Sequence, residues 1–192
     1  FNVPGPHMCE PSLQRTPVLF QAGQSGRGVE FAARHAEAVF ALMADLDHCR
    51  VSAEKVRNAV ANEGRATEHV KIFPGITPIV GESDAHAQEK FEQMTEFSSP
   101  EGALALFSGW VGVDLATVTS DMLLSDTKTD AIQGLLSYFE VIDPDREWTV
   151  EAMGEQISIG SVMPKFIGSP TTIADQLEFW MDECDINGFN VA

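Results

Sequence analysis

The chain of 192 residues has few basic side chains, few cysteines and no long apolar run. Only 12 Lys and Arg accompany 29 Asp and Glu, so the formal charge is −17. Such a surface repels phosphate backbones and anionic lipid, which excludes nucleic acid and membrane surfaces as expected partners. No stretch reaches the ~18 consecutive apolar residues of a membrane-spanning helix.

Cysteine and histidine are also too sparse and too scattered for a metal centre. Cys9, Cys49 and Cys184 form no CxxC pair, and the five histidines show no HxH or HExxH spacing. We therefore expect no disulfide framework and no metal site, but buried reduced thiols in a cytoplasmic protein.

What the chain does contain is enough apolar material for a core, at 44% of its residues. It shows no internal repeat, low-complexity segment or linker. It begins at Phe1 without an initiator Met and stops at Phe189-Asn-Val-Ala192 in a strand-like pattern. We therefore expect an internal piece of a longer polypeptide, with residues 1–192 forming one partial domain.

Strand-like apolar runs alternate with helix-like periodic stretches, which is typical of βαβ units with a parallel sheet. The second predicted helix is expected to begin at a Ser52 cap and to end at Gly64. The predicted strands are 17–21, 38–43, 70–80 and 188–192.

Residues 98–165 interrupt this alternation, and we interpret them as an insertion before the last strand. Four strands with three crossover helices predict an α/β fold, namely the C-terminal half of a TIM-type (β/α)8 barrel. An open flavodoxin-like sheet is the alternative fold.

The segment with most chemical information is Pro17-Val-Leu-Phe-Gln-Ala-Gly-Gln-Ser-Gly-Arg-Gly28, in which a buried strand leads through a glycine turn to a serine that starts a helix. The first amides of a helix have no intrahelical acceptor, and the helix dipole favours an anion there. Gly23 and Ser25 therefore indicate a phosphate cradle at the carboxyl end of a strand. An ordinary βα turn with a serine cap is the alternative. The spacing matches neither the Walker A loop, nor GxGxxG, nor the GxSxG nucleophile elbow.

Three stretches of the chain resemble the nitrilotriacetate monooxygenase component A family, a branch of the bacterial-luciferase-like flavin monooxygenases that includes dibenzothiophene-sulfone and long-chain alkane monooxygenases. Residues 17–40 match every fixed position of the family pattern PVLxQAGxSxxGxxFAAxxAExVF. The stretches VKIFPGITPIVGESDAHA and FIGSPTTIADQLEFW...DINGFNVA also agree. The departures are Leu13, where the family commonly has Pro, and Asn187, where it commonly has Asp.

This resemblance implies a luciferase-like barrel that binds reduced FMN, supplied by a separate flavin reductase, and uses O₂ to oxygenate a small organic substrate of the xenobiotic type. On the matching positions, Ala22, Gly23, Gln24 and Ser25 are the expected FMN-phosphate contacts. The catalytic residues stay unassigned. Relatives of this kind are commonly oligomers, so we expect a homo-oligomer for the full-length protein.

Two other functions remain open. One is a deazaflavin-dependent oxidoreductase of the same superfamily, which uses no O₂. The other is an inactive half-barrel fragment with no catalysis of its own. The FAARHAE continuation after the cradle and the 98–165 segment favour the monooxygenase.

Overall fold

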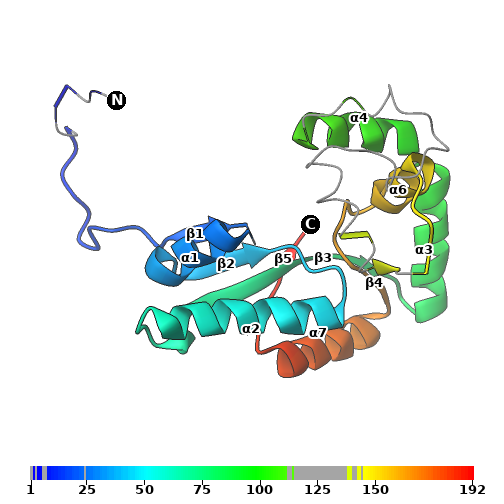
Figure 1. The fold of residues 1–192 in the computed structure, drawn as a ribbon. Helices are drawn as coiled ribbons and strands as arrows, with labels where there is room; N and C mark the ends of the chain where they lie inside the picture. Colours follow the sequence, from blue (N-terminus) through cyan, green and yellow to red (C-terminus); the bar gives the residue numbers. More distant parts are fainter. Residues whose placement is uncertain are drawn as a thin grey trace.

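The computed structural model describes residues 2, 4–5, 8–23, 25–111, 114, 138–139, 142–143 and 145–192. A parallel β-sheet forms its centre (Figure 1). The strands are β1 (Phe20–Ala22), β2 (Ala38–Ala41), β3 (Lys71–Val80), β4 (Lys165–Gly168) and β5 (Asn190–Val191). The helices are α1 (Gly26–His35), α2 (Leu46–Asn62), α3 (Asp84–Glu96), α4 (Pro100–Val111), α6 (Val150–Ile157) and α7 (Pro170–Cys184), with a 3₁₀ turn at Thr67–His69.

The four predicted strands lie side by side in sequence order. β1 pairs with β2, β2 with β3, and β3 with β5, and all three pairings are parallel. The fifth strand, β4, was not predicted, and it pairs in parallel with residues 77–80 of β3. Its four residues are too few to show a periodic pattern, and only its distant partner on β3 makes it a strand.

The long strand β3 has β4 and β5 on opposite edges. The Ile76 carbonyl accepts a hydrogen bond from the Ala192 amide, 3.0 Å away, whereas the next amide, Thr77, donates to the Pro164 carbonyl, also at 3.0 Å. Successive residues of a strand direct their backbone groups to opposite edges. β4 therefore continues the β2 edge of β3, and β5 occupies the other edge.

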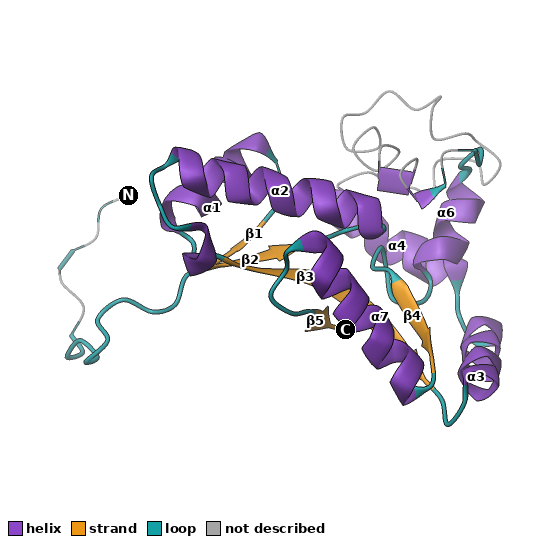
Figure 2. Ribbon diagram, turned by 90° about the horizontal axis from the view of Figure 1, so that it is seen from below, coloured by secondary structure: helices purple, strands orange, loops and turns teal. Residues whose placement is uncertain are grey.

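Helices α1, α2 and α7 cover one face of this sheet. Figure 2 shows α2 and α7 in front of the strands when the molecule is seen from below. Val39 and Ile72 pack on this face against buried side chains of the three helices, among them Ala32, Val60 and Cys184. Burying each aliphatic side chain of this size stabilises the fold by about 1.5–3 kcal/mol.

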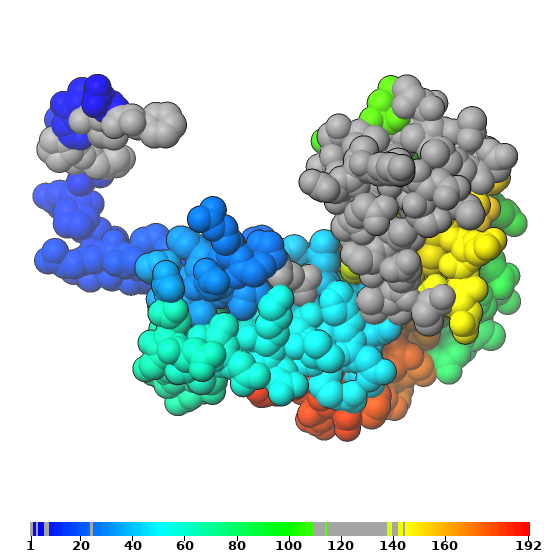
Figure 3. Space-filling model, in the orientation of Figure 1, coloured from blue at the N-terminus to red at the C-terminus, as the bar shows by residue number. Residues whose placement is uncertain are grey.

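The opposite face of β1, β2 and β3 is left partly open. On this face Phe20 is 66% exposed and Phe40 is half-buried. Partial exposure was predicted for Phe40 and for Leu19, which is 40% exposed just before β1, but alternation along the strand directs the Leu19 side chain to the other face. In Figure 3 the segment before β1 extends away from the body of the molecule, and its Met8 and Leu13 are fully exposed.

Residues 98–165 contain a second small core. Phe107 of α4 and Met153 of α6 pack with Phe139 and Trp148 in one buried cluster. A helix predicted near residues 130–140 lies almost wholly outside the described residues.

Side-chain caps explain where five of the helices begin. The capping side chains of Ser25, Asp45, Ser83, Thr149 and Ser169 each accept a hydrogen bond from the amide three residues later. Each such bond satisfies one of the amides that a helix start leaves unpaired.

The predicted start of α2 at Ser52 is wrong, because Ser52 lies inside the helix. The Asp45 carboxylate accepts from the His48 amide at 2.7 Å and starts the helix earlier. The buried stripe already begins at Cys49, so packing extends α2 toward its N-terminus. The predicted end is confirmed, since Gly64 adopts a φ of 71° directly after the cap residue.

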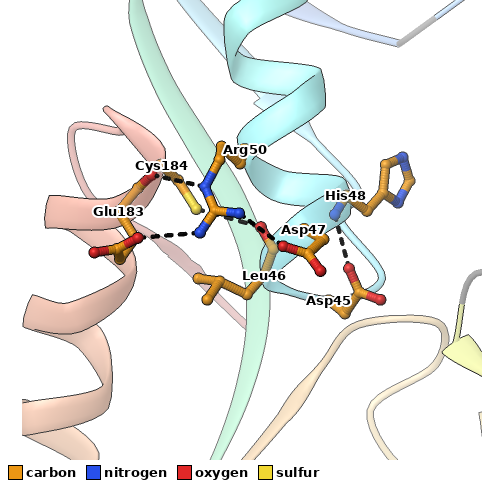
Figure 4. A network of polar contacts seen from close by, with 7 residues as sticks. All are labelled: Asp45, Leu46, Asp47, His48, Arg50, Glu183 and Cys184. Carbon is orange, nitrogen blue, oxygen red and sulfur yellow. Dashed lines mark hydrogen bonds and ion pairs between the residues drawn. The ribbon is translucent and has the colours of Figure 1, made fainter.

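The N-terminal turn of α2 contacts the C-terminal turn of α7 (Figure 4). Arg50 forms ion pairs with Asp47 at 2.7 Å and with Glu183 at 3.0 Å, and the Cys184 thiol donates to the Leu46 carbonyl at 3.5 Å. The ion pairs are exposed, so they contribute little to stability. Orientation of the two helices depends mainly on the buried residues beneath them.

The cysteine prediction is right for two of the three residues. Cys49 and Cys184 are buried, and burial raises the pKa of both thiols, which keeps them protonated and unreactive. Cys9 is exposed, contrary to the prediction, because it lies in the segment that extends away from the sheet.

Asp84 links the start of α3 to the start of α7. One carboxylate oxygen, Oδ1, accepts from the Ser169 amide and from the Thr172 hydroxyl, each at 2.7 Å. The hydrogen bond from the Ser169 amide, followed by those from the Thr172 and Ser169 hydroxyls, lowers the pKa of Asp84. The N-terminus of α7 is thus already occupied by an anion from within the chain.

The hydrogen bonds of the Asp84 carboxylate predict that part of the free energy of unfolding depends on pH. Because the pKa of Asp84 is lowered in the folded state, its contribution is present above the unfolded value of about 4 and is lost as the pH falls through the folded value. We expect Asp84→Asn to reduce the loss of stability between about pH 5 and pH 2. Urea midpoints across this range provide the measurement. Asp182→Asn, at an exposed position of α7, controls for a lost surface charge, and identical pH profiles for the wild type and Asp84→Asn would contradict the role of this link.

Candidate functional site

The predicted cradle lies at the carboxyl end of β1, where parallel sheets usually hold ligands. β1 ends at Ala22, Gly23 follows with a φ of 125°, and Ser25 caps α1. A φ in this range favours glycine, which explains why Gly23 stands at the turn. Ser25 is exposed and lies neither inside the helix nor in the apolar core, as the sequence predicts.

The start of α1 presents backbone amides to solvent. Ser25 Oγ accepts from the Gly28 amide at 3.1 Å, and the Ser25 carbonyl accepts from the Val29 amide at 2.9 Å. Within the described part of the chain, the amides of Gly26 and Arg27 have no acceptor. A β-carbon at position 28 would lie 3.0 Å from the Gly23 carbonyl oxygen, so only glycine fits there without a shift.

The charge around this turn favours an anion. The first turn of α1 contains no acidic residue and includes the exposed Arg27, whereas α2, α3, α4 and α6 each have an acidic residue in their first turn. The N-terminus of α7 is satisfied by Asp84. In a chain with a net charge of −17, the start of α1 is therefore an uncompensated positive helix end.

The structure brings together three of the four predicted contact residues. Ala22, Gly23 and Ser25 are exposed and lie along the same turn, while Gln24 lies outside the described residues. The neighbouring Gln21 uses its side-chain amide to donate to the Ala22 carbonyl at 2.9 Å. Gln21 thus holds the backbone of the turn.

An aromatic surface adjoins the cradle. In the parallel register Ala22 aligns with Phe40, and Phe40 aligns with Phe73, so their side chains point to the same open face. The Phe20 and Phe73 rings stack at 6.4 Å with an interplanar angle of 22°. We call the rings of Phe20, Phe40 and Phe73 the aromatic floor.

The aromatic floor forms most of the lining of an open cavity of about 300 Å³, with Phe189 and Asn190 completing it. Gly75 lies beneath it, because a β-carbon there would approach Met163 Sδ to 2.9 Å and Phe40 to 3.2 Å. The missing side chain lets Met163 and Phe40 pack over the strand. A flat ring bound on the aromatic floor would therefore contact the phenylalanine side chains. Its far end would lie close to the cradle at Ala22.

Sequence reasoning missed the aromatic floor because its members come from three strands. Alternation along β3 indicates that Phe73 and Ile72 point to opposite faces, but only the register shows that Phe40 and Phe73 are neighbours. The sequence offered one signal for this surface, because each of the first three predicted strands contains a phenylalanine, namely Phe20, Phe40 or Phe73.

A larger depression of about 560 Å³ lies beside α3, lined by Lys90, Met94 and Phe97 among others. The Lys90 ammonium donates to the Val80 carbonyl at 2.6 Å, so its hydrogen-bonding capacity is partly used within the fold. The depression lies away from the carboxyl end of β1. We therefore place the candidate site at the cradle and the aromatic floor.

The residues that the structure describes offer neither a metal site nor a membrane-spanning helix. Among these residues, no three His, Cys, Asp or Glu side chains lie close enough to hold a metal ion. No described helix combines the length and the apolar character needed to cross a bilayer.

Residues 1–182 match the family model described as luciferase-like monooxygenase. Among curated proteins, the dimethyl-sulfide monooxygenase of Hyphomicrobium sulfonivorans is 40% identical over 192 residues, and the long-chain alkane monooxygenase of Geobacillus thermodenitrificans is 36% identical over 191 residues. The nitrilotriacetate monooxygenase component A of Aminobacter aminovorans is 32% identical over 195 residues. Each alignment covers 100% of this chain but only 40%, 39% and 43% of the respective relative.

Solved structures of the same kinds of protein are also similar to this chain. The crystal structure of the Hyphomicrobium sulfonivorans protein superposes with a TM-score of 0.84 at 41% identity, covering 100% of this chain and 40% of that one. A riboflavin lyase structure, described as containing modified FMN and riboflavin, superposes with a TM-score of 0.78 at 26% identity, covering 93% of this chain and 39% of that one. The chain thus spans about two fifths of the length of the proteins that it matches.

Proposed function

Because this chain belongs to the luciferase-like monooxygenase family, we propose that it is part of an enzyme that uses reduced FMN and O₂ to oxygenate a small organic substrate of the xenobiotic type. The observation that carries this proposal is the exposed cradle at Ser25 joined to the aromatic floor. An anion-binding helix start beside a flat apolar surface suits a phosphorylated ring cofactor.

The residues present fit FMN. The unpaired amides of Gly26 and Arg27 and the Ser25 hydroxyl would hold its phosphate, together with the backbone of Ala22, Gly23 and Gln24. The aromatic floor would lie against the flavin ring system. When bound, reduced FMN supplies the electrons for activating O₂, while the protein orients the ring and keeps water away from it.

The proposal includes the rest of the barrel. We place the chain as the C-terminal half of a (β/α)8 barrel, with residues 98–165 inserted before the last strand, and assign the other strands to sequence outside these 192 residues. The ~40% coverage of the relatives and the open face of β1, β2 and β3 support this placement. The isolated half would then lack the remaining cofactor contacts and be inactive.

The partners and the subfamily follow from the same proposal. A separate flavin reductase would supply reduced FMN, the complete protein would form a homo-oligomer, and both would act in the cytoplasm. We place the chain in the branch that includes nitrilotriacetate monooxygenase component A. The fixed positions of residues 17–40 and the 32% identity over 195 residues support this branch.

Ser25→Ala tests the cradle in the complete protein. Loss of the hydroxyl removes one hydrogen bond to a charged phosphate, so the dissociation constant of FMN should rise by about 5-fold or more, equivalent to roughly 1 kcal/mol. Flavin fluorescence titration provides the measurement, and a deazaflavin cofactor titrated in parallel tests the alternative oxidoreductase.

Ser83→Ala is the matched control. Ser83 caps α3 through the His86 amide at 3.2 Å, so this substitution removes an equivalent helix cap away from the cradle. It should leave the affinity for FMN unchanged. Equal FMN affinity in Ser25→Ala and in the wild type would count against the cradle.

A further inference from the structure

Resting on the function proposed above, we infer that Met163 is a modification site, at which hydrogen peroxide formed on the aromatic floor converts the thioether to methionine sulfoxide and weakens the binding of FMN. Met163 belongs to the turn that leads into β4, and this turn places its side chain over the open face of β3. Its sulfur therefore lies at the margin of the surface proposed for the flavin ring.

Met163 and Phe40 are neighbours over Gly75. A β-carbon at Gly75 would lie 2.9 Å from Met163 Sδ and 3.2 Å from Phe40 Cε2, so both side chains occupy the space that glycine leaves. Positions 73 and 75 of β3 share one face of the sheet, which is the face of the floor. A thioether beside an aromatic ring makes a favourable contact. Met163 thus supports the Phe40 side of the aromatic floor.

Hydrogen bonds hold the turn of Met163 against the sheet. The Met163 amide donates to the Gly160 carbonyl at 3.2 Å, and the same carbonyl accepts from the Thr77 hydroxyl at 3.4 Å. The Tyr138 hydroxyl donates to the carbonyl of Val162, directly before Met163. The sulfur therefore has a defined position beside the floor.

The oxidant follows from the proposed reaction. When no organic substrate is present to accept oxygen, O₂ that takes two electrons and two protons from reduced FMN becomes hydrogen peroxide. The sulfur lone pair of Met163 attacks one peroxide oxygen, the O–O bond breaks, and the other oxygen leaves as water with both protons. Sulfur loses the two electrons that the peroxide gains, so the step needs no further reactant.

Oxidation changes the margin of the floor. The sulfoxide adds a polar oxygen to a side chain that packs over the backbone of Gly75 and beside the Phe40 ring. A polar oxygen without a hydrogen-bond donor is unfavourable there, so the oxidised side chain turns toward water. Phe40 then loses its neighbour, and the floor binds the flavin ring less tightly.

Three other methionines provide internal controls. Met8, Met94 and Met181 are 96%, 44% and 38% exposed, whereas Met163 is partly buried. Peroxide that arrives from solution should oxidise these three residues first, because they are the more accessible. Peroxide that forms on the floor should oxidise Met163 first.

The test follows each methionine by peptide mass spectrometry of the complete protein. Reduced FMN and O₂ are supplied without an organic substrate, and catalase removes peroxide that escapes into solution. We expect at least about 5-fold more sulfoxide at Met163 than at Met181, and the reverse order when hydrogen peroxide is added to the flavin-free protein without catalase. No oxidation of Met163 in the first treatment, or the same order in both treatments, would overturn the inference.

Met163→Leu connects the oxidation to flavin binding, because leucine has a similar volume and no sulfur. The dissociation constant of FMN is measured by fluorescence titration before and after the incubation with catalase, and each protein is compared with itself. It should rise by about 5-fold or more in the wild type and in Met181→Leu, the matched control on α7, but not in Met163→Leu.

The titrations also separate this inference from the proposed function. An equal rise in Met163→Leu and in the wild type would overturn the role of Met163 while leaving FMN binding intact. Absence of FMN binding in the untreated wild type would overturn the proposed function and, with it, this inference.

Discussion

Replacing Arg57 with methionine is expected to lower the free energy of unfolding by about 2–4 kcal/mol, among the larger effects of a single substitution in this chain. The Arg57 side chain is only 12% exposed. Its guanidinium donates to the carbonyls of Thr67 and Val70 at 2.8 and 2.6 Å. It also donates to the Asp185 carbonyl at 2.8 Å and to Asn187 Oδ1 at 3.1 Å.

These bonds join three separate parts of the fold. Arg57 lies on α2, Thr67 and Val70 lead into β3, and Asp185 and Asn187 connect α7 to β5. Methionine fills a similar volume but leaves the carbonyls without donors, and each buried unsatisfied polar group costs about 1–3 kcal/mol. Urea denaturation followed by circular dichroism measures the loss in free energy of unfolding.

Arg34→Met provides a matched control for Arg57→Met. Arg34 pairs with Glu63 at 2.9 Å, but these side chains are 56% and 34% exposed. Removal of such a surface pair should change the stability by less than about 1 kcal/mol. If Arg34→Met and Arg57→Met lower the free energy of unfolding equally, the hydrogen bonds of Arg57 contribute no more to stability than an exposed ion pair does.

Asn187→Asp tests the same hydrogen bonds by changing an acceptor of the Arg57 guanidinium. Asn187 Oδ1 accepts from Arg57 and from the Ile72 amide at 3.0 Å, so a carboxylate would keep both bonds and gain the charge of Arg57. We expect equal or slightly higher stability at neutral pH. This fits the family resemblance, in which Asp is common at this position.

The 192 residues expressed alone are expected to self-associate. The face of β1, β2 and β3 that carries the aromatic floor exposes Phe20, and Val191 on the short strand β5 is 64% exposed. Open strand edges and exposed apolar rings favour pairing with a second copy or aggregation. Light scattering coupled to size-exclusion chromatography should detect dimers or larger species, and FMN should bind poorly.

A charged residue on this face tests whether copies of the chain associate through it. Phe20→Lys should raise the monomer fraction, because the ammonium would be desolvated in any contact through the face. Phe31→Lys is the control, since Phe31 is 54% exposed on the outer side of α1. A soluble monomer of the unmodified chain with micromolar FMN affinity would instead indicate a complete open-sheet domain.

Much of the local structure follows from short-range signals in the sequence. The order of strand, glycine, serine and helix from Phe20 to Gly28 predicted both the turn and the exposed Ser25. The positive φ of Gly64 ended α2 where expected. These features succeed because a cap or a glycine turn depends on residues a few positions apart.

The start of α2 and the strand β4 required tertiary information. Ser52 can cap a helix, but Asp45 is available earlier and the buried stripe of α2 favours the longer helix. Lys165–Gly168 is a strand only because residues 77–80 of β3 provide an edge for it. Both errors arise because contacts between residues far apart in the sequence override a weak local preference for secondary structure.

The sequence by itself therefore determined the family, the alternation of strands and helices, and the turn at Gly23 and Ser25. Only the tertiary structure decided that β4 and β5 take opposite edges of β3, that Arg57 ties α2 to the turn before β5, and that Phe20, Phe40 and Phe73 form one surface. The physical reason is that caps and turns are fixed by neighbouring residues, whereas register and surface composition depend on which distant strands pair.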